Sequence, residues 1–97
     1  MEKINKQKII SVFGSCGERD RGKRPLMGKI VSGNADLVIV TNEDPHGEDP
    51  LRIINEITRG IQDKIEGKNF WKILDRREAI KKALQLAEAG DFIIVTG

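Results

Sequence analysis

The amino-acid sequence predicts an α/β fold, a three-layer sandwich built on a mostly parallel sheet. Three short apolar runs, at residues 9–14, 35–41 and 91–97, are nearly continuous and rich in β-branched side chains, as in strands buried on both faces. Helical patterns lie between these runs, so strands and helices alternate along the chain. With 97 residues, 38% hydrophobic and 33% charged, the chain suits one small domain with a single core.

The first strand and the first helix are expected near the start of the chain. The strand is the run IISVFG at residues 9–14, and a charged loop follows it. Pro25 suits the first turn of a helix, where its missing N–H costs nothing, and Gly33-Asn34 suits the exit. Apolar side chains of this helix recur at helical spacing, at Leu26, Ile30 and Val31.

The second strand, ADLVIVT at residues 35–41, leads through an acidic loop into the clearest helix. Asp49 is the expected N-cap of this helix and Pro50 its first residue. Gly60 lies near its expected end. Its apolar side chains repeat every three or four residues, at Leu51, Ile54, Ile57 and Ile61.

The last third of the chain predicts a strand, a helix and a final strand. The run FWKIL at residues 70–74 is the expected strand, and we expect its Trp71 to pack against a neighbouring helix rather than bind a ligand. Asp75 caps the helix that follows, Gly90 is its expected stop, and DFIIVTG at 91–97 is the final strand. The inner stripe of that helix is expected at Ala79, Ile80, Ala83, Leu84 and Ala87.

Composition argues against nucleic acid and membrane as partners. The 17 basic and 15 acidic residues give a net charge of only +2, and no aromatic-rich basic face accompanies them. Cys16 is the single cysteine, which suits a structural role in a reducing cytoplasm. No apolar stretch reaches the roughly 18 residues of a membrane span, and the charged start MEKINKQK precedes no signal-peptide core.

The predicted topology directs attention to three loops. In a parallel α/β sheet, ligands meet the loops at the carboxyl ends of the strands. These loops are residues 14–24, residues 41–49 and whatever follows Gly97. The sequence stops at the end of a predicted strand, where a parallel sheet usually continues, so we expect Gly97 to be a boundary rather than a natural terminus.

The first of these loops, GERDRGKR, has the glycine and lysine spacing of a phosphate-binding P-loop. Arg24 stands where a P-loop needs a Ser or Thr hydroxyl for Mg²⁺, and the four residues between Gly17 and Gly22 are all charged, which argues against that motif. Two interpretations stay open: a solvated loop with an internal Arg–Asp pair, or an anion-binding loop. The cations available for the second are Arg19, Arg21, Lys23 and Arg24.

The second loop, TNEDPHGEDP, is acidic and contains His46, the only histidine. One histidine among carboxylates is a poor ligand set for a transition metal, so an acidic pocket for an amine or ammonium group is the better hypothesis. With a positive loop and a negative loop at one sheet edge, a zwitterion such as an amino acid would suit the pair.

Four stretches together resemble a known family: VFGSCGERDRGKRPLMGKI, ADLVIVTNEDPHGEDPLRIINEI, DRREAIKKAL and GDFIIVTG. They are similar to the C-terminal domain of the Mur ligases, and most similar to the branch that adds the third residue of the peptidoglycan stem peptide. The resemblance extends from about Ile9 to Gly97. It implies a Rossmann-like fold and an ATP-dependent acid–amino-acid ligase acting through an acyl phosphate on a UDP-MurNAc-dipeptide.

The resemblance also implies that this domain works as part of a larger enzyme. The full ligase has a UDP-sugar domain, a central ATPase domain that mainly binds ATP and Mg²⁺, and this domain, which closes over the ATPase domain. The isolated fragment is therefore expected to be inactive, with no catalytic and no metal-binding residue of its own. The amino-acid site would be lined by Arg19, Glu43, Asp44, Pro45, His46 and Gly97, and Lys23 would face the nucleotide.

One departure from the family pattern bears on the substrate. Diaminopimelate-adding members read Asp-Asn-Pro-Arg where this chain has Glu43, Asp44, Pro45 and His46. An arginine would grip a distal carboxylate bidentately, whereas His46 is mostly neutral at neutral pH and Asp44 adds negative charge. We therefore expect the added residue to carry a free distal ammonium, as lysine and ornithine do, and not to be meso-diaminopimelate.

Two other functions stay open from the sequence. One is a related amide ligase of the cyanophycin-synthetase or folylpolyglutamate-synthase type, which shares this domain. The other is a Rossmann-like binding module without enzymatic activity. The joint occurrence of GERDRGKRP and DPHGEDP favours the stem-peptide ligase.

Overall fold

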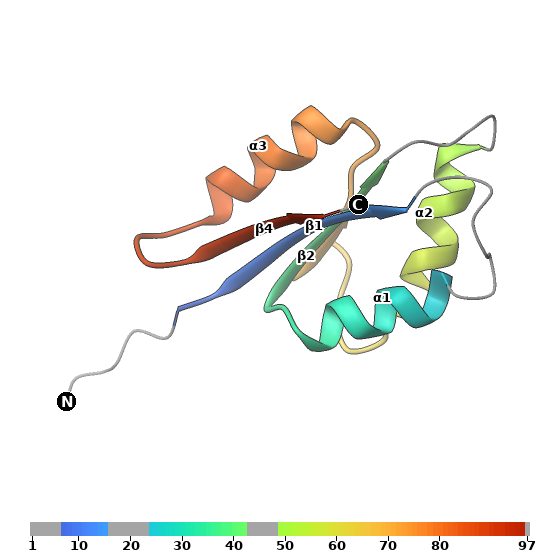
Figure 1. The fold of residues 1–97 in the computed structure, drawn as a ribbon, viewed down its shortest axis with the longest axis horizontal. Helices are drawn as coiled ribbons and strands as arrows, with labels where there is room; N and C mark the ends of the chain where they lie inside the picture. Colours follow the sequence, from blue (N-terminus) through green and yellow to red (C-terminus); the bar gives the residue numbers. More distant parts are fainter. Residues whose placement is uncertain (1–6, 16–23, 43–48, 97) are drawn as a thin grey trace.

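The computed structural model describes residues 7–15, 24–42 and 49–96 of the chain. Within these ranges strands and helices alternate from β1 to β4, as the sequence predicts (Figure 1). The elements are β1 (Ile9–Ser15), α1 (Arg24–Gly33), β2 (Leu37–Asn42), α2 (Pro50–Thr58), β3 (Phe70–Lys72), α3 (Arg76–Leu86) and β4 (Phe92–Thr96).

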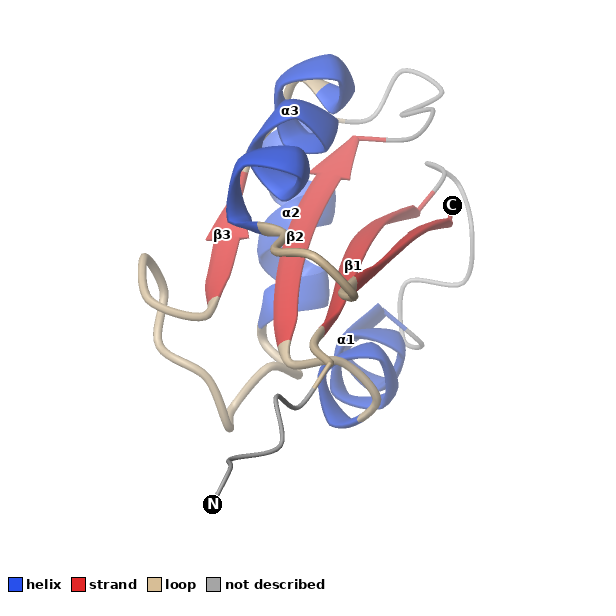
Figure 2. Cartoon of the chain, turned by 90° about the vertical axis from the view of Figure 1, so that its left-hand side faces the viewer, coloured by secondary structure: helices blue, strands red, loops and turns tan. Residues whose placement is uncertain are grey.

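The described strands form one parallel sheet in the order β3-β2-β1-β4 (Figure 2). β1 pairs with β2 through the register Ile10 to Leu37, and with β4 through Ile10 to Ile93. The chain therefore steps outward from β1 to β3 and then returns through α3 to the other side of β1. Because parallel crossovers are right-handed, this reversal moves the helix to the opposite face. Figure 1 accordingly shows α3 on one face of the sheet, with α1 and α2 on the other.

Two cores result, one on each face of the sheet, because successive side chains of a strand point to opposite faces. The core under α1 and α2 joins Phe13, Val38, Val40 and Phe70 of the strands to Ile53, Ile54, Ile57 and Ile61. The core under α3 joins Ile10, Val12 and Ile39 to Ala79 and Ala83. The three-layer α/β sandwich predicted from the sequence is thus confirmed.

The predicted helix caps and the predicted role of Trp71 are also confirmed. The carboxylate of Asp49 accepts a hydrogen bond from the backbone N–H of Leu51 at 3.1 Å, and Pro50 opens α2. Asp75 accepts from the N–H of Arg77 at 2.9 Å in the same way. Trp71 packs on the α3 side of the sheet, where the Nζ atom of Lys82 lies 5.1 Å from its ring centroid.

The apolar repeat of the helices is confirmed as buried at Ile54, Ile57, Ile61, Ala79 and Ala83, but other positions of the repeat are exposed. Leu26 and Ile30 of α1 are each 54% exposed, Leu51 is 44% exposed and Leu84 is 64% exposed. In α3 the positions that meet the sheet are Ala79 and Ala83, so the next residue, Leu84, is turned about 100° away from it. In α1 the buried face turns toward α2 and carries a different set of residues, described below.

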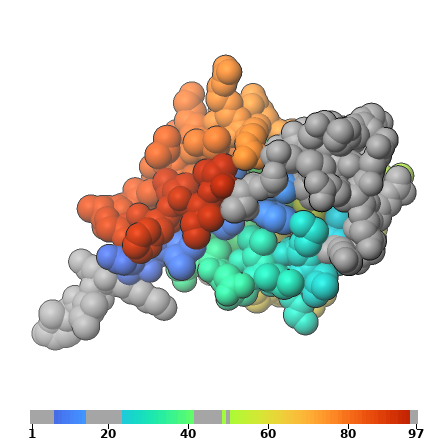
Figure 3. All heavy atoms as spheres, viewed as in Figure 1, coloured from blue at the N-terminus to red at the C-terminus, as the bar shows by residue number. Residues whose placement is uncertain are grey.

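The final strand is less buried than the sequence predicts. Phe92, Ile94 and Val95 are 56%, 45% and 43% exposed, whereas Ile93 packs under α3. The reason is that β4 is an edge strand of the described sheet: the face with Phe92 and Ile94 is open, and on the α3 face Ile93 packs against the core while Val95 stays exposed. Figure 3 shows β4 at the surface between α3 and α1.

Three predicted boundaries also shift. The second strand begins at Leu37, and β3 ends at Lys72 rather than continuing to residue 74. Gly90 does not stop α3, which ends at Leu86 with Ala87 as its C-cap. Gly90 instead has a φ of 92° in the turn before β4, a conformation that favours glycine. None of the helices in the described ranges is both long enough and apolar enough to span a bilayer.

Candidate functional site

The carboxyl edge of the sheet brings together the ends of both predicted ligand loops. The register pairs Ser15 at the end of β1 with Asn42 at the end of β2, and Phe13 with Thr96 near the end of β4. α1 and α2 both begin at this edge, because each follows a strand and runs back along the sheet. The strand order reverses between β1 and β4, which makes this point the topological switch point where such sheets bind ligands.

The residues that the sequence assigns to the amino acid and the nucleotide lie outside the described residues. They are Arg19, Lys23, Glu43, Asp44, Pro45, His46 and Gly97. Cys16 and Arg21 lie outside as well. The structure describes the residues that anchor these segments, and the assignments themselves stay predictions.

Arg24 is the one loop cation whose place is described, and it points into the protein. Its side chain is fully buried, and its Nη1 atom lies 2.7 Å from Oε1 of Glu56 in α2. The other carboxylate oxygen of Glu56 accepts from Nε of Arg52 at 3.3 Å, one helical turn away. This ion pair joins Arg24 to α2 and not to another residue of the loop, and the described residues test neither interpretation of the loop.

The environment of Glu56 favours its ionised form. The hydrogen bond from Arg24 is the largest cause, and with the bond from Arg52 it lowers the pKa of the Glu56 carboxyl below 4.5, although burial acts in the opposite direction. The side chain of Glu56 is only 15% exposed. The negative charge that stabilises Arg24 is therefore present throughout the neutral range.

The face of α1 that carries Arg24 is in contact with α2 and the segment after it. Arg24, Gly28 and Ser32 are spaced four residues apart and are all buried. A side chain at Gly28 would overlap the carbonyl oxygen of Ile57, and one at Gly60 would overlap the carbonyl oxygen of Pro25. The backbones of the two helices therefore touch.

The far end of the same face is held by hydrogen bonds. The hydroxyl of Ser32 donates to Oδ1 of Asp63 at 2.5 Å, which is the largest cause that lowers the pKa of the Asp63 carboxyl. Nζ of Lys64 donates to the Ser32 carbonyl oxygen at 2.7 Å, in the last turn of α1 where a cation is favourable. α1 is thus attached to the α2 region along its whole length.

Two further contacts fix the elements around the edge. Thr41, fully buried near the end of β2, donates from Oγ1 to the carbonyl oxygen of Leu74 at 3.2 Å. Asp49, the last acidic residue of the second loop, is engaged by its own helix as the N-cap. Its carboxylate is therefore directed to the start of α2.

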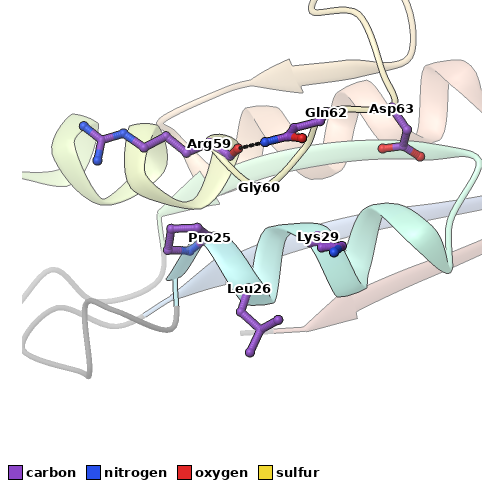
Figure 4. A pocket seen from close by; sticks show the side chains of 7 residues that line it. All are labelled: Pro25, Leu26, Lys29, Arg59, Gly60, Gln62 and Asp63. Carbon is purple, nitrogen blue, oxygen red and sulfur yellow. Dashed lines mark hydrogen bonds between the residues drawn. The ribbon is translucent and has the colours of Figure 1, made fainter.

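The described surface also contains a shallow hollow of about 330 Å³ along the contact between α1 and α2. Figure 4 shows residues of α1 on one side of it and the segment after α2 on the other. Its lining is Pro25, Leu26, Lys29, Arg59, Gly60, Gln62 and Asp63. Among the residues that the structure describes, no group of three or more His, Cys, Asp or Glu side chains is placed to hold a metal ion.

Sequence reasoning missed the pairing of Arg24 with Glu56 and the buried face around it. The signal was present in the spacing of Arg24, Gly28 and Ser32, since a glycine inside a helix usually has a packing reason. The apolar residues Leu26 and Ile30 are also four residues apart and predict a different buried face of α1, which the structure shows to be exposed.

Comparison with known proteins adds independent information. The family profile "Mur ligase, glutamate ligase domain" matches residues 1–97. The chain is 49% identical over 90 residues to UDP-N-acetylmuramyl-tripeptide synthetase of Borreliella burgdorferi, covering 93% of this chain and 18% of that protein. It is 47% identical over 94 residues to UDP-N-acetylmuramoyl-L-alanyl-D-glutamate–2,6-diaminopimelate ligase of Syntrophomonas wolfei, covering 97% of this chain and 19% of that protein.

A solved structure of a UDP-N-acetylmuramoyl-L-alanyl-D-glutamate–2,6-diaminopimelate ligase superimposes with a TM-score of 0.82 at 41% identity. The match covers 93% of this chain and 18% of that one. The chain thus spans about a fifth of the length of the curated relatives that it matches.

Proposed function

Because this chain belongs to the Mur ligase family and corresponds to the C-terminal, glutamate ligase domain, we propose that it is part of an ATP-dependent ligase that adds the third residue to UDP-MurNAc-dipeptide in peptidoglycan synthesis. The observation that carries the proposal is the 47–49% identity, over nearly the whole chain, to two ligases of this precursor. Both relatives are named for muramoyl precursors, which favours this ligase over the cyanophycin-synthetase and folylpolyglutamate-synthase types.

The proposed role of this domain is to bind the incoming amino acid at the carboxyl edge of the sheet. Arg19 would pair with the α-carboxylate, and the segment from Glu43 to His46, together with Gly97, would line the rest of the site. Support comes from the switch point between β1 and β4 and from the shared edge at which both segments begin and end. A cation on one segment and carboxylates on the other match the two charges of an amino acid.

The second proposed role is to close the ATP site of a central domain in the longer protein, with Lys23 facing the nucleotide. ATP would supply the phosphoryl group that activates a substrate carboxylate, and the amine held by this domain would then attack the acyl phosphate. From the resemblance to the family, the proposal assigns Mg²⁺ and most of the ATP contacts to that central domain. The reaction would take place in the cytoplasm, and the 97-residue chain alone would be inactive.

We propose further that the added amino acid carries a free distal ammonium, as in lysine or ornithine. The basis is sequence: Asp44 and His46 stand where diaminopimelate-adding members carry asparagine and arginine. The name of the Syntrophomonas wolfei relative specifies 2,6-diaminopimelate, which makes that compound the competing substrate to test.

A ligation assay on the complete protein tests these proposals. Purified enzyme is supplied with ATP, Mg²⁺, UDP-MurNAc-dipeptide and one amino acid from a panel of lysine, ornithine and meso-diaminopimelate, and phosphate release is measured. We expect activity that depends on all components, with lysine or ornithine preferred. A clear preference for meso-diaminopimelate would refute the substrate proposal, and absence of ligation with every amino acid would refute the ligase itself.

A further inference from the structure

We draw no further inference here: the strongest candidate, the open apolar face that Phe92 and Ile94 form on the edge strand β4, carries none, because nothing in the described part of the chain shows what covers it.

Discussion

The guanidinium of Arg24 and the carboxylate of Glu56 form an ion pair of 2.7 Å that joins the first residue of α1 to α2, across 32 positions of sequence. Arg24 is completely buried and Glu56 is 15% exposed. Removing one partner of such a pair leaves the other charge buried without compensation, which costs more than the pair itself contributes. The pair therefore makes the junction of the two helices sensitive to single substitutions.

Glu56→Gln should lower the free energy of unfolding of the chain by about 3 kcal/mol at pH 7, because the buried guanidinium of Arg24 then loses the carboxylate that lies 2.7 Å from it. Urea unfolding followed by circular dichroism measures this. Arg52→Met is the control, since Arg52 contacts the same carboxylate from a position 56% exposed and should cost less than about 0.5 kcal/mol. Equal losses of unfolding free energy in Glu56→Gln and Arg52→Met would show that the buried Arg24 contributes no more to the cluster than the exposed Arg52.

The contribution of Glu56 should also depend on pH in a defined direction. Its pKa is lowered in the folded chain, chiefly by the hydrogen bond from Arg24, so ionised Glu56 stabilises the folded state at pH values above 4.5. That contribution is lost as the pH falls from 4.5 through the lowered pKa. The difference in unfolding free energy between wild type and Glu56→Gln should accordingly be complete at pH 7 and shrink in acid. If the difference in unfolding free energy stayed constant down to acid pH, the stabilisation by Glu56 would not come from its negative charge.

Gly28→Ala should destabilise the chain by about 2 kcal/mol, because its new methyl group would meet the backbone of Ile57, which cannot move aside cheaply. Gly33→Ala is the matched control in the same helix, since nothing lies within 4 Å of its added carbon. That variant should be neutral or more stable by up to about 1 kcal/mol, as alanine is the better helix former. Equal unfolding temperatures for the two variants would show that α1 and α2 do not touch at Gly28.

Periodicity and capping residues were enough to predict the order of elements, the parallel sheet and both aspartate N-caps. They predicted the buried positions Ile54, Ile57, Ala79 and Ala83 of α2 and α3 but not the buried side of α1. In α1 the face that meets α2 is made of an arginine, a glycine and a serine, because close backbone contact needs small residues and the ion pair needs Glu56. The burial of β4 was overestimated for a related reason, since strand composition does not show whether a second layer covers the strand.

The candidate site was predictable only at the level of the sheet edge. The strand order places the switch point between β1 and β4. This order depends on pairings between segments far apart in the sequence, and no local sequence pattern predicts it. The role of Arg24 illustrates the limit, because its neighbours in sequence suggested a ligand contact and its neighbour in space is Glu56. The assignments of Arg19, Lys23 and His46 stay predictions.

The two faces of α3 give a second matched comparison. Ala83 is fully buried against the sheet, so Ala83→Leu should overpack the core and cost about 1–3 kcal/mol. Leu84, the next residue, is 64% exposed, so Leu84→Lys should change the free energy of unfolding by less than about 0.5 kcal/mol. Unfolding curves of the two variants measure the difference. A large loss in Leu84→Lys would mean that another surface covers this face of α3.

The substrate proposal predicts that specificity can be moved toward diaminopimelate. The double variant Asp44→Asn, His46→Arg restores the residues of the diaminopimelate-adding members, removes one negative charge and supplies a bidentate donor for a distal carboxylate. A charge-assisted hydrogen bond contributes about 1.5–3 kcal/mol, so kcat/KM for meso-diaminopimelate relative to lysine should rise by roughly 10- to 100-fold in the complete enzyme. Steady-state ligation rates with each amino acid give the ratio, and the single variants show which position contributes more.

Arg19→Lys is the control for this prediction. Because the distal group is recognised separately from the α-carboxylate, Arg19→Lys should weaken the binding of both substrates alike and leave the ratio unchanged. A double variant that retains the wild-type ratio would place the specificity of the enzyme elsewhere than residues 43–46.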